Sequence, residues 1–206
     1  MTQRMQELAA EILRLQSELD GEIEKRRTQL GWHINERMVA FEHGIAVEHR
    51  RLRKTVKSFL ADAPVSVVAT SPVIYSLIVP LLLIDAWVSL YQAICFRAYR
   101  IARVRRADYI VFDRRHLAYL NWIEVLNCLY CGYANGVFAY IREIGSRTEQ
   151  FWCPIKHALR IADPHQRYYE FLEYGDADGY RARLEEFRER LRADPDSSHK
   201  VDDAGA

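Results

Sequence analysis

The sequence predicts a mostly α-helical, membrane-attached protein, and three observations carry that prediction. The N-terminal part of the chain is highly charged and repeats apolar residues at helical steps of three and four. Residues 65–96 form an apolar stretch in which Asp85 is the only formal charge. Residues 128–157 hold three of the four cysteines and a histidine. We therefore expect a long amphipathic helical arm, an apolar hairpin or span, and a small helical Cys/His metal-binding domain.

The composition limits the partners and compartments that we expect. The 206 residues carry a formal net charge of +1, which gives no overall field to attract nucleic acid, so we expect no nucleic-acid partner. Four cysteines are too few in a chain of this size for a disulfide-dense secreted scaffold. Residues 1–20 lack the continuous apolar core of a signal peptide, so we expect the chain to begin in the cytoplasm.

Residues 1–60 are predicted to form the helical arm. Their apolar stripe runs through Leu8, Ile12, Leu15, Leu19 and Ile23, and it resumes at Leu30, Ile34, Met38, Phe41, Ile45, Leu52, Val56 and Phe59. Glycines at positions 21, 31 and 44 would allow a break into two or three helices. Such an arm either folds back on its own domain or forms a self-associating coiled coil, and its charged flanks fit both interpretations.

Residues 61–106 are predicted to be the membrane segment with its basic flanks. About 20 helical residues cross a bilayer core of about 30 Å, so residues 65–96 are long enough for one crossing. Five basic residues stand on each side: Arg50, Arg51, Arg53, Lys54 and Lys57 before it, and Arg97, Arg100, Arg103, Arg105 and Arg106 after it. Because the positive-inside rule then gives no direction, a hairpin with both flanks in the cytoplasm satisfies it most simply.

Two further features favour a hairpin or two short helices over a single span. Pro72 and Pro80 remove backbone donors and can kink or break a helix midway. Asp85 would be costly in the middle of a bilayer. A single span is the alternative, because a helical bundle in an oligomer would shelter that carboxylate.

Residues 107–165 are predicted to be the metal-binding domain, built on two helices. Residues 114–127 and 137–152 both space their apolar residues as helices do. The sequence GYANG between them contains Asn135–Gly136, a dipeptide typical of turns, so we expect the chain to reverse there.

The remaining residues are predicted to be a surface helix and a tail. Residues 166–193 contain a helical apolar repeat, and Glu186 and Arg190 are spaced to pair one turn apart on its exposed face. The repeat consists of Tyr180, Leu184, Phe187 and Leu191. Residues 194–206 have the composition of a disordered tail.

Cys128, Cys131, Cys153 and His157 are the predicted metal ligands. Two thiols separated by two residues can converge on one ion, and the glycine after Cys131 lets the backbone turn beneath it. Cys153-Pro154 suits a helix start, where backbone amides lower the pKa of a thiol, and His157 follows one turn later. With the reversal at GYANG, the C-x2-C-x21-C-x3-H set fits a closed Cys3His zinc site. Glu149 is the carboxylate expected to orient the imidazole.

Other interpretations of the cysteines stay open. The same four residues could hold iron or an iron–sulfur cluster. Cys128 and Cys131 could instead act as a redox dithiol, or all of them could pack as small apolar residues, as we expect of Cys95.

The sequence favours a scaffold over an enzyme. It contains no Gly-rich phosphate loop, no GxSxG and no HExxH motif, and no Glu-x-x-His pairs of a di-iron site. We expect a membrane-anchored protein with a structural zinc site on the cytoplasmic face and a self-associating or partner-binding N-terminal arm. The alternative is a membrane-associated redox or electron-transfer protein that uses iron at the same ligands, or the CxxC dithiol.

Overall fold

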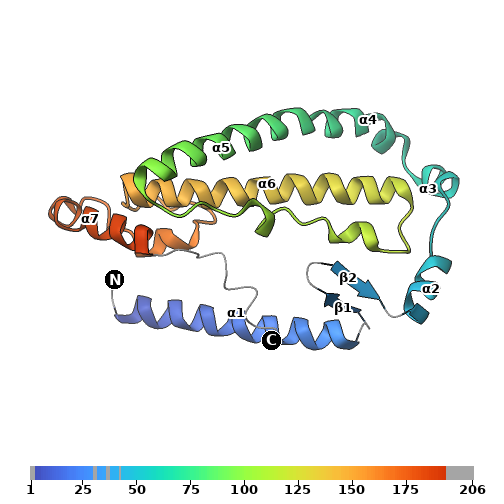
Figure 1. The fold of residues 1–206 in the computed structure, drawn as a ribbon, viewed down its shortest axis with the longest axis horizontal. Coiled ribbons are helices and arrows are strands. Elements are labelled where there is room, and N and C mark those ends of the chain that lie inside the picture. The colour runs from blue at the N-terminus through green and yellow to red at the C-terminus, as the bar shows by residue number, and fades with distance from the viewer. Residues whose placement is uncertain (1–2, 30–31, 36–37, 42, 194–206) are drawn as a thin grey trace. The chain divides into compact units, whose positions relative to one another are not determined.

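The computed structural model describes residues 3–29, 32–35, 38–41 and 43–193, and these are mostly helical, as predicted (Figure 1). The chain divides into two compact units. The arm unit comprises Met1–Val65 with Asp113–Leu129, and the main unit comprises Ser66–Phe112 with Tyr130–Ala206. The predicted tail at 194–206 lies outside the described residues.

The arm unit begins with helix α1 (Gln3–Gln29), which confirms the first part of the predicted arm. Its charged flanks form ion pairs along the helix, such as those of Arg14 with Glu11 (2.6 Å) and Glu18 (2.8 Å). The apolar stripe is largely exposed. Leu8, Ile12, Leu15, Leu19 and Ile23 have between 49% and 60% of their surface exposed.

The prediction that the helical stripe continues through Ile34, Met38 and Phe41 is wrong. Strands β1 (Trp32–Asn35) and β2 (Met38–Phe41) pair antiparallel, with Trp32 opposite Phe41. The sequence WHIN alternates apolar and polar residues, so this run satisfies the strand period of two as well as helical spacing. Two short helices follow, α2 (His43–Arg51) and α3 (Val56–Asp62).

The apolar stretch forms two consecutive helices, α4 (Val65–Ser76) and α5 (Ile78–Tyr99). Of the predicted alternatives, a hairpin, two short helices or a single span, the hairpin is therefore wrong. Leu77 between them keeps a right-handed helical conformation (φ −63°, ψ −15°), and α4 and α5 follow one direction in Figure 1. Pro72 is accommodated inside α4, and Pro80 lies in the first turn of α5, where a missing amide costs no helical hydrogen bond. Together they form the one described helix, 35 residues long, that is long and apolar enough to cross a membrane.

The chain reverses after the apolar stretch, at Arg100, which adopts the left-handed conformation (φ 60°, ψ 38°). It then returns through two short 3-10 helices, η1 (Arg106–Asp108) and η2 (Asp113–His116), to helix α6 (Trp122–Trp152). The helix predicted at 114–127 therefore begins at Trp122, eight residues later than predicted. Asn121 caps α6, because its Oδ1 accepts from the amide of Glu124 (3.1 Å) while the Glu124 carboxylate accepts from the Asn121 amide (2.8 Å).

Helices α5 and α6 lie side by side in the main unit and run in the same direction. Three contacts follow one another along both helices: Tyr133 with Asp85, Tyr140 with Ser89 and Thr148 with Tyr91. The returning segment, residues 101–112, packs against both helices and supplies three buried residues of the core, Ile101, Val104 and Ile110. The other buried members of these two clusters are Leu81, Phe96, Tyr133, Val137, Tyr140, Ile144, Phe151 and Leu191.

The prediction of a turn at GYANG is also wrong, because these residues lie inside α6. Gly132 and Gly136 are one turn apart on the face that the returning segment covers. A Cβ at Gly136 would lie 2.6 Å from the carbonyl oxygen of Tyr109, and one at Gly132 would lie 3.3 Å from that of Val111. The two glycines therefore serve close packing of backbone against helix.

The C-terminal part of the main unit contains η3 (Gln166–Glu170) and α7 (Ala177–Ala193), so the surface helix predicted at 166–193 is confirmed only from Ala177 onward. Phe187 of α7 is buried with Phe171 and Leu172. The predicted pair of Glu186 and Arg190 is formed.

Candidate functional site

The structure does not bring the four predicted metal ligands together. Cys128 and Cys131 lie one turn apart within α6, and Cys153 directly follows the end of the same helix. Because a helix rises 1.5 Å per residue, Cys131 and Cys153 are about 33 Å apart along its axis. Within the described residues, no three His, Cys, Asp or Glu side chains are grouped so that they could hold a metal ion.

The missing reversal explains that separation. The predicted site required a turn at GYANG to carry residues 153–157 back to Cys128, and α6 runs straight through this sequence. The iron and iron–sulfur alternatives use the same four residues, which are too far apart in this structure to bind one iron or one cluster. The dithiol interpretation needs only Cys128 and Cys131, and it stays a prediction.

The expectation that Cys153-Pro154 starts a helix is wrong. The amide of Cys153 donates to the carbonyl of Glu149 (2.8 Å), which is the last turn of α6, and the residues that follow form no helix. Ile155 forms a parallel bridge with Leu172, held by the bonds of Leu172 N to Pro154 O (2.9 Å) and Lys156 N to Leu172 O (2.7 Å).

The surroundings of Cys153 therefore act on its thiol in the opposite sense to the prediction. At a helix C-terminus the free groups are carbonyls, which disfavour a negative charge. Burial, and then the charge of Glu149, raise the pKa of the Cys153 thiol. The neutral thiol is favoured, which makes this residue a poorer metal ligand and nucleophile.

His157 and Glu149, expected to act together, contact different residues. The backbone amide of His157 donates to the hydroxyl of Tyr168 (2.8 Å), and its ring stacks on the Tyr168 ring. Glu149 instead pairs with His165 Nε2 (2.8 Å). Because His165 Nδ1 accepts from the Tyr168 amide (3.1 Å), Nε2 carries the proton and donates to the carboxylate.

A buried charged cluster around Glu143 ties together three parts of the main unit. Its carboxylate accepts from Arg147 Nε (2.7 Å) and Arg167 Nη2 (3.0 Å), and Arg147 also donates to the carbonyl of Ala102 (2.9 Å). Burial by itself would raise the pKa of Glu143, but the two guanidinium groups outweigh it and hold that pKa below its ordinary value. A carboxylate that stays ionised at neutral pH between two fixed cations joins segments and is poorly suited to proton transfer.

An apolar groove of about 380 Å³ lies between α5 and α6. Its walls are almost entirely apolar, and Glu149 and Cys153 are among its few polar groups. The other lining residues are Val88, Tyr91, Ile141, Ile144, Gly145, Thr148 and Trp152. The groove therefore offers no pairing of an activated nucleophile with a base.

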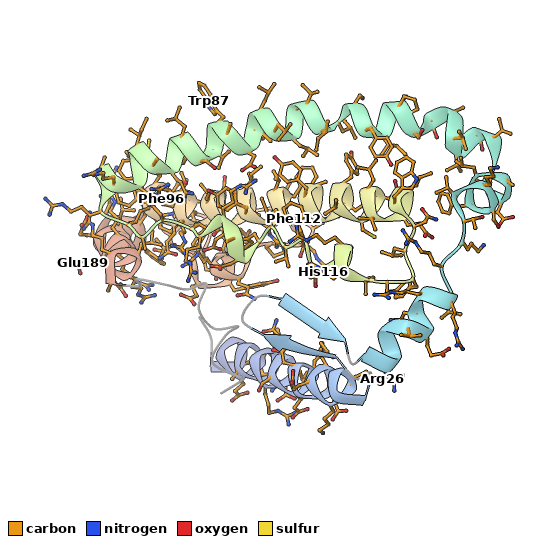
Figure 2. All side chains as sticks on the ribbon, turned by 45° about the vertical axis from the view of Figure 1, so that its right-hand side comes forward. Arg26, Trp87, Phe96, Phe112, His116 and Glu189 are labelled. Carbon is orange, nitrogen blue, oxygen red and sulfur yellow. The ribbon has the colours of Figure 1, made fainter. Side chains whose placement is uncertain are left out.

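The most distinctive surface is on α5, where polarity is inverted. Its buried face carries Asp85, which binds Arg106 (2.6 Å) and Tyr133 (2.9 Å), and Gln92, which is 2% exposed. Its outward stripe, which we call the outer face, is apolar: Leu83, Trp87, Leu90 and Ile94 are 68%, 73%, 53% and 61% exposed. Figure 2 shows Trp87 projecting away from the rest of the main unit, whereas Phe96 points inward. Pattern analysis of the sequence detected the apolar stretch but not this division into two faces.

Neither a protein-family model, a curated protein nor a solved structure matches this chain. The fold by itself defines a mostly helical protein with an apolar helix of membrane-spanning length.

Proposed function

We propose that this protein is a membrane-attached scaffold, in which α4 and α5 contact lipid and α1 binds a protein partner or a second copy of the chain. The supporting observation is the inverted polarity of α5. A helix on the surface of a soluble protein places its polar residues outward, whereas α5 places Asp85 and Gln92 inward and apolar side chains outward. Such a surface is stable when hydrocarbon, and not water, covers it.

The apolar surface is far larger than a soluble monomer usually exposes. Only 6% of the most apolar 18-residue window of α4–α5 is buried within the protein. The exposed apolar side chains outside the outer face include Val65, Val67, Val68, Val73, Ile74, Leu77, Val79, Leu82 and Ile84. Because residues 101–112 and α6 cover the inward face of α5, lipid would contact that helix on its outward side.

The N-terminal helix supplies the second half of the proposal. Leu8, Ile12, Leu15 and Leu19 follow the alternating steps of four and three that place side chains on a coiled-coil seam. They are half exposed and have charged residues beside them. A partner helix, from another protein or a second copy, would bury that seam.

The experiment is fractionation of the full chain between membranes and the soluble phase. The double variant Leu83→Glu/Trp87→Glu is expected to leave the membrane fraction, because each carboxylate in hydrocarbon costs a few kcal/mol. The double variant Leu159→Glu/Val111→Glu makes the same chemical change at residues that are 82% and 53% exposed elsewhere in the main unit. It should stay with the membranes. A wild-type chain that is soluble and monodisperse without detergent would contradict the proposal.

A further inference from the structure

The outer face of α5 ends in a basic residue. Leu83, Trp87, Leu90 and Ile94 recur at steps of four and three, and the next position in that series is Arg97, in the last turn of the helix. Arg97 is exposed, as the four apolar residues are. An arginine at the end of an apolar stripe can lay its methylenes along the hydrocarbon and place its guanidinium in the headgroup layer.

Two more arginines follow closely and share one property with Arg97. Arg100, at the left-handed reversal, and Arg103, in the returning segment, are both exposed. Neighbouring arginines have carboxylate partners: Arg106 binds Asp85 (2.6 Å), and Arg105 lies 3.7 Å from Asp108. The side chains of Arg97, Arg100 and Arg103 form no such ion pair with any described residue.

The same contrast holds against the C-terminal half of the main unit. Most of the arginines there pair with a carboxylate of the protein, as in the pairs of Arg142 with Asp163 and Arg188 with Glu185. The exceptions among the described residues, Arg160 and Arg181, lie far apart in the sequence. A single cation beside the carbonyls at the end of α5 is accounted for by the helix dipole. Arg97, Arg100 and Arg103 follow one another within seven residues and have no carboxylate partners, which exceeds that need, and this run of arginines begins where the apolar outer face ends.

We infer that Arg97, Arg100 and Arg103 bind the phosphate groups of anionic phospholipids at the membrane that α4 and α5 contact. The inference rests on the proposed membrane attachment and adds the class of lipid. Guanidinium groups bind phosphate oxygens with two parallel hydrogen bonds, so a negatively charged leaflet complements this end of the helix in charge and geometry. Each arginine near a negatively charged surface is expected to strengthen binding about fivefold.

The test is flotation of the full chain with phosphatidylcholine vesicles, with and without phosphatidylglycerol, at low and high salt. The wild-type protein should bind the phosphatidylglycerol vesicles more tightly, and salt should weaken that preference. The triple variant Arg97→Gln/Arg100→Gln/Arg103→Gln should lose most of the preference, about a hundredfold at low salt. The matched control is Arg160→Gln/Arg181→Gln/Arg183→Gln, which removes the same charge from exposed sites of the main unit and should bind as the wild type does.

The outcomes separate this inference from the proposal beneath it. Equal binding of the wild type to both kinds of vesicle, or an unchanged preference in the triple variant, would overturn the inference while leaving attachment intact. Failure of the wild type to float with either vesicle would overturn the attachment and the inference together. If the triple variant does not fold, Arg97→Gln and Arg97→Lys provide the comparison, and only the first should lose about fivefold.

Discussion

Gln92 of α5 holds the backbone of Val104 with both ends of its amide group. Its Nε2 donates to the Val104 carbonyl (3.3 Å) and its Oε1 accepts from the Val104 amide (3.0 Å), as a neighbouring strand would do. Both residues are almost completely buried. A side chain of a helix therefore supplies the hydrogen-bond partners that the backbone of Val104 would otherwise find in a neighbouring strand.

Replacing Gln92 with methionine should destabilise the protein by about 2–4 kcal/mol, because two buried backbone groups lose their partners. Methionine keeps much of the shape of the side chain and removes its polar atoms. Thermal unfolding in detergent measures the effect, with Leu90→Met on the outer face as control. An unfolding temperature equal to that of the control would show that the pairing contributes nothing.

Two glycines of α6 should respond in opposite directions to the same substitution. Gly136→Ala places a Cβ 2.6 Å from a backbone oxygen and should cost about 1–3 kcal/mol. Gly145→Ala places one where no atom lies within 4 Å and should stabilise by about 0.5–1 kcal/mol through helix propensity. Chemical denaturation of both variants provides the comparison. Stabilisation by both would mean that the returning segment does not pack on α6.

The Asp85–Arg106 pair should be asymmetric, because the Asp85 side chain is 9% exposed and that of Arg106 is 47% exposed. Arg106→Met leaves a buried carboxylate and should cost about 2–4 kcal/mol, whereas Asp85→Asn leaves a cation that reaches water and should cost about 1 kcal/mol. The double variant Asp85→Asn/Arg106→Met should be more stable than Arg106→Met alone. Equal losses of unfolding free energy in Arg106→Met and Asp85→Asn would contradict the predicted asymmetry of the pair.

Stability should decline in acid through Glu143. The pKa of Glu143 is lowered in the folded state, so its contribution is fully present above its unfolded pKa of about 4.3 and is lost as the pH falls through the folded value. Glu143→Gln should flatten that part of the curve of unfolding free energy against pH. Glu189→Gln changes an exposed carboxylate of α7 and should leave the curve as it is. An unaltered slope in Glu143→Gln would refute the assignment.

The thiol of Cys153 should alkylate slowly at neutral pH. Its pKa is raised by burial and by Glu149, so less of the reactive thiolate is present than in a free cysteine. The rate of iodoacetamide modification against pH, followed on the Cys153 peptide, measures this. Glu149→Gln should speed the reaction, and Glu173→Gln, an exposed control, should not. A midpoint at or below about 8.5, the value of a free thiol, would contradict the prediction.

The cysteines show how far the candidate site could be predicted. The spacing C-x2-C-x21-C-x3-H shows which side chains could bind a metal. Whether these four side chains meet at one ion depended on a reversal of the chain at GYANG. Asn135–Gly136 is typical of turns when nothing packs against it. In α6 the same glycine is needed for contact with Tyr109, and information about that neighbour lies 27 residues earlier in the sequence.

The sequence by itself determined the helical class, helices α1 and α7 and the position of the apolar stretch, because periodicity and composition are local properties of the chain. Only the tertiary structure decided that Pro72 and Gly136 lie inside helices, that Cys131 and Cys153 stay far apart, and that α5 buries Asp85 while exposing Trp87. The physical reason is that packing against residues 101–112 selects which faces of α5 and α6 are covered, and that selection depends on residues distant in sequence.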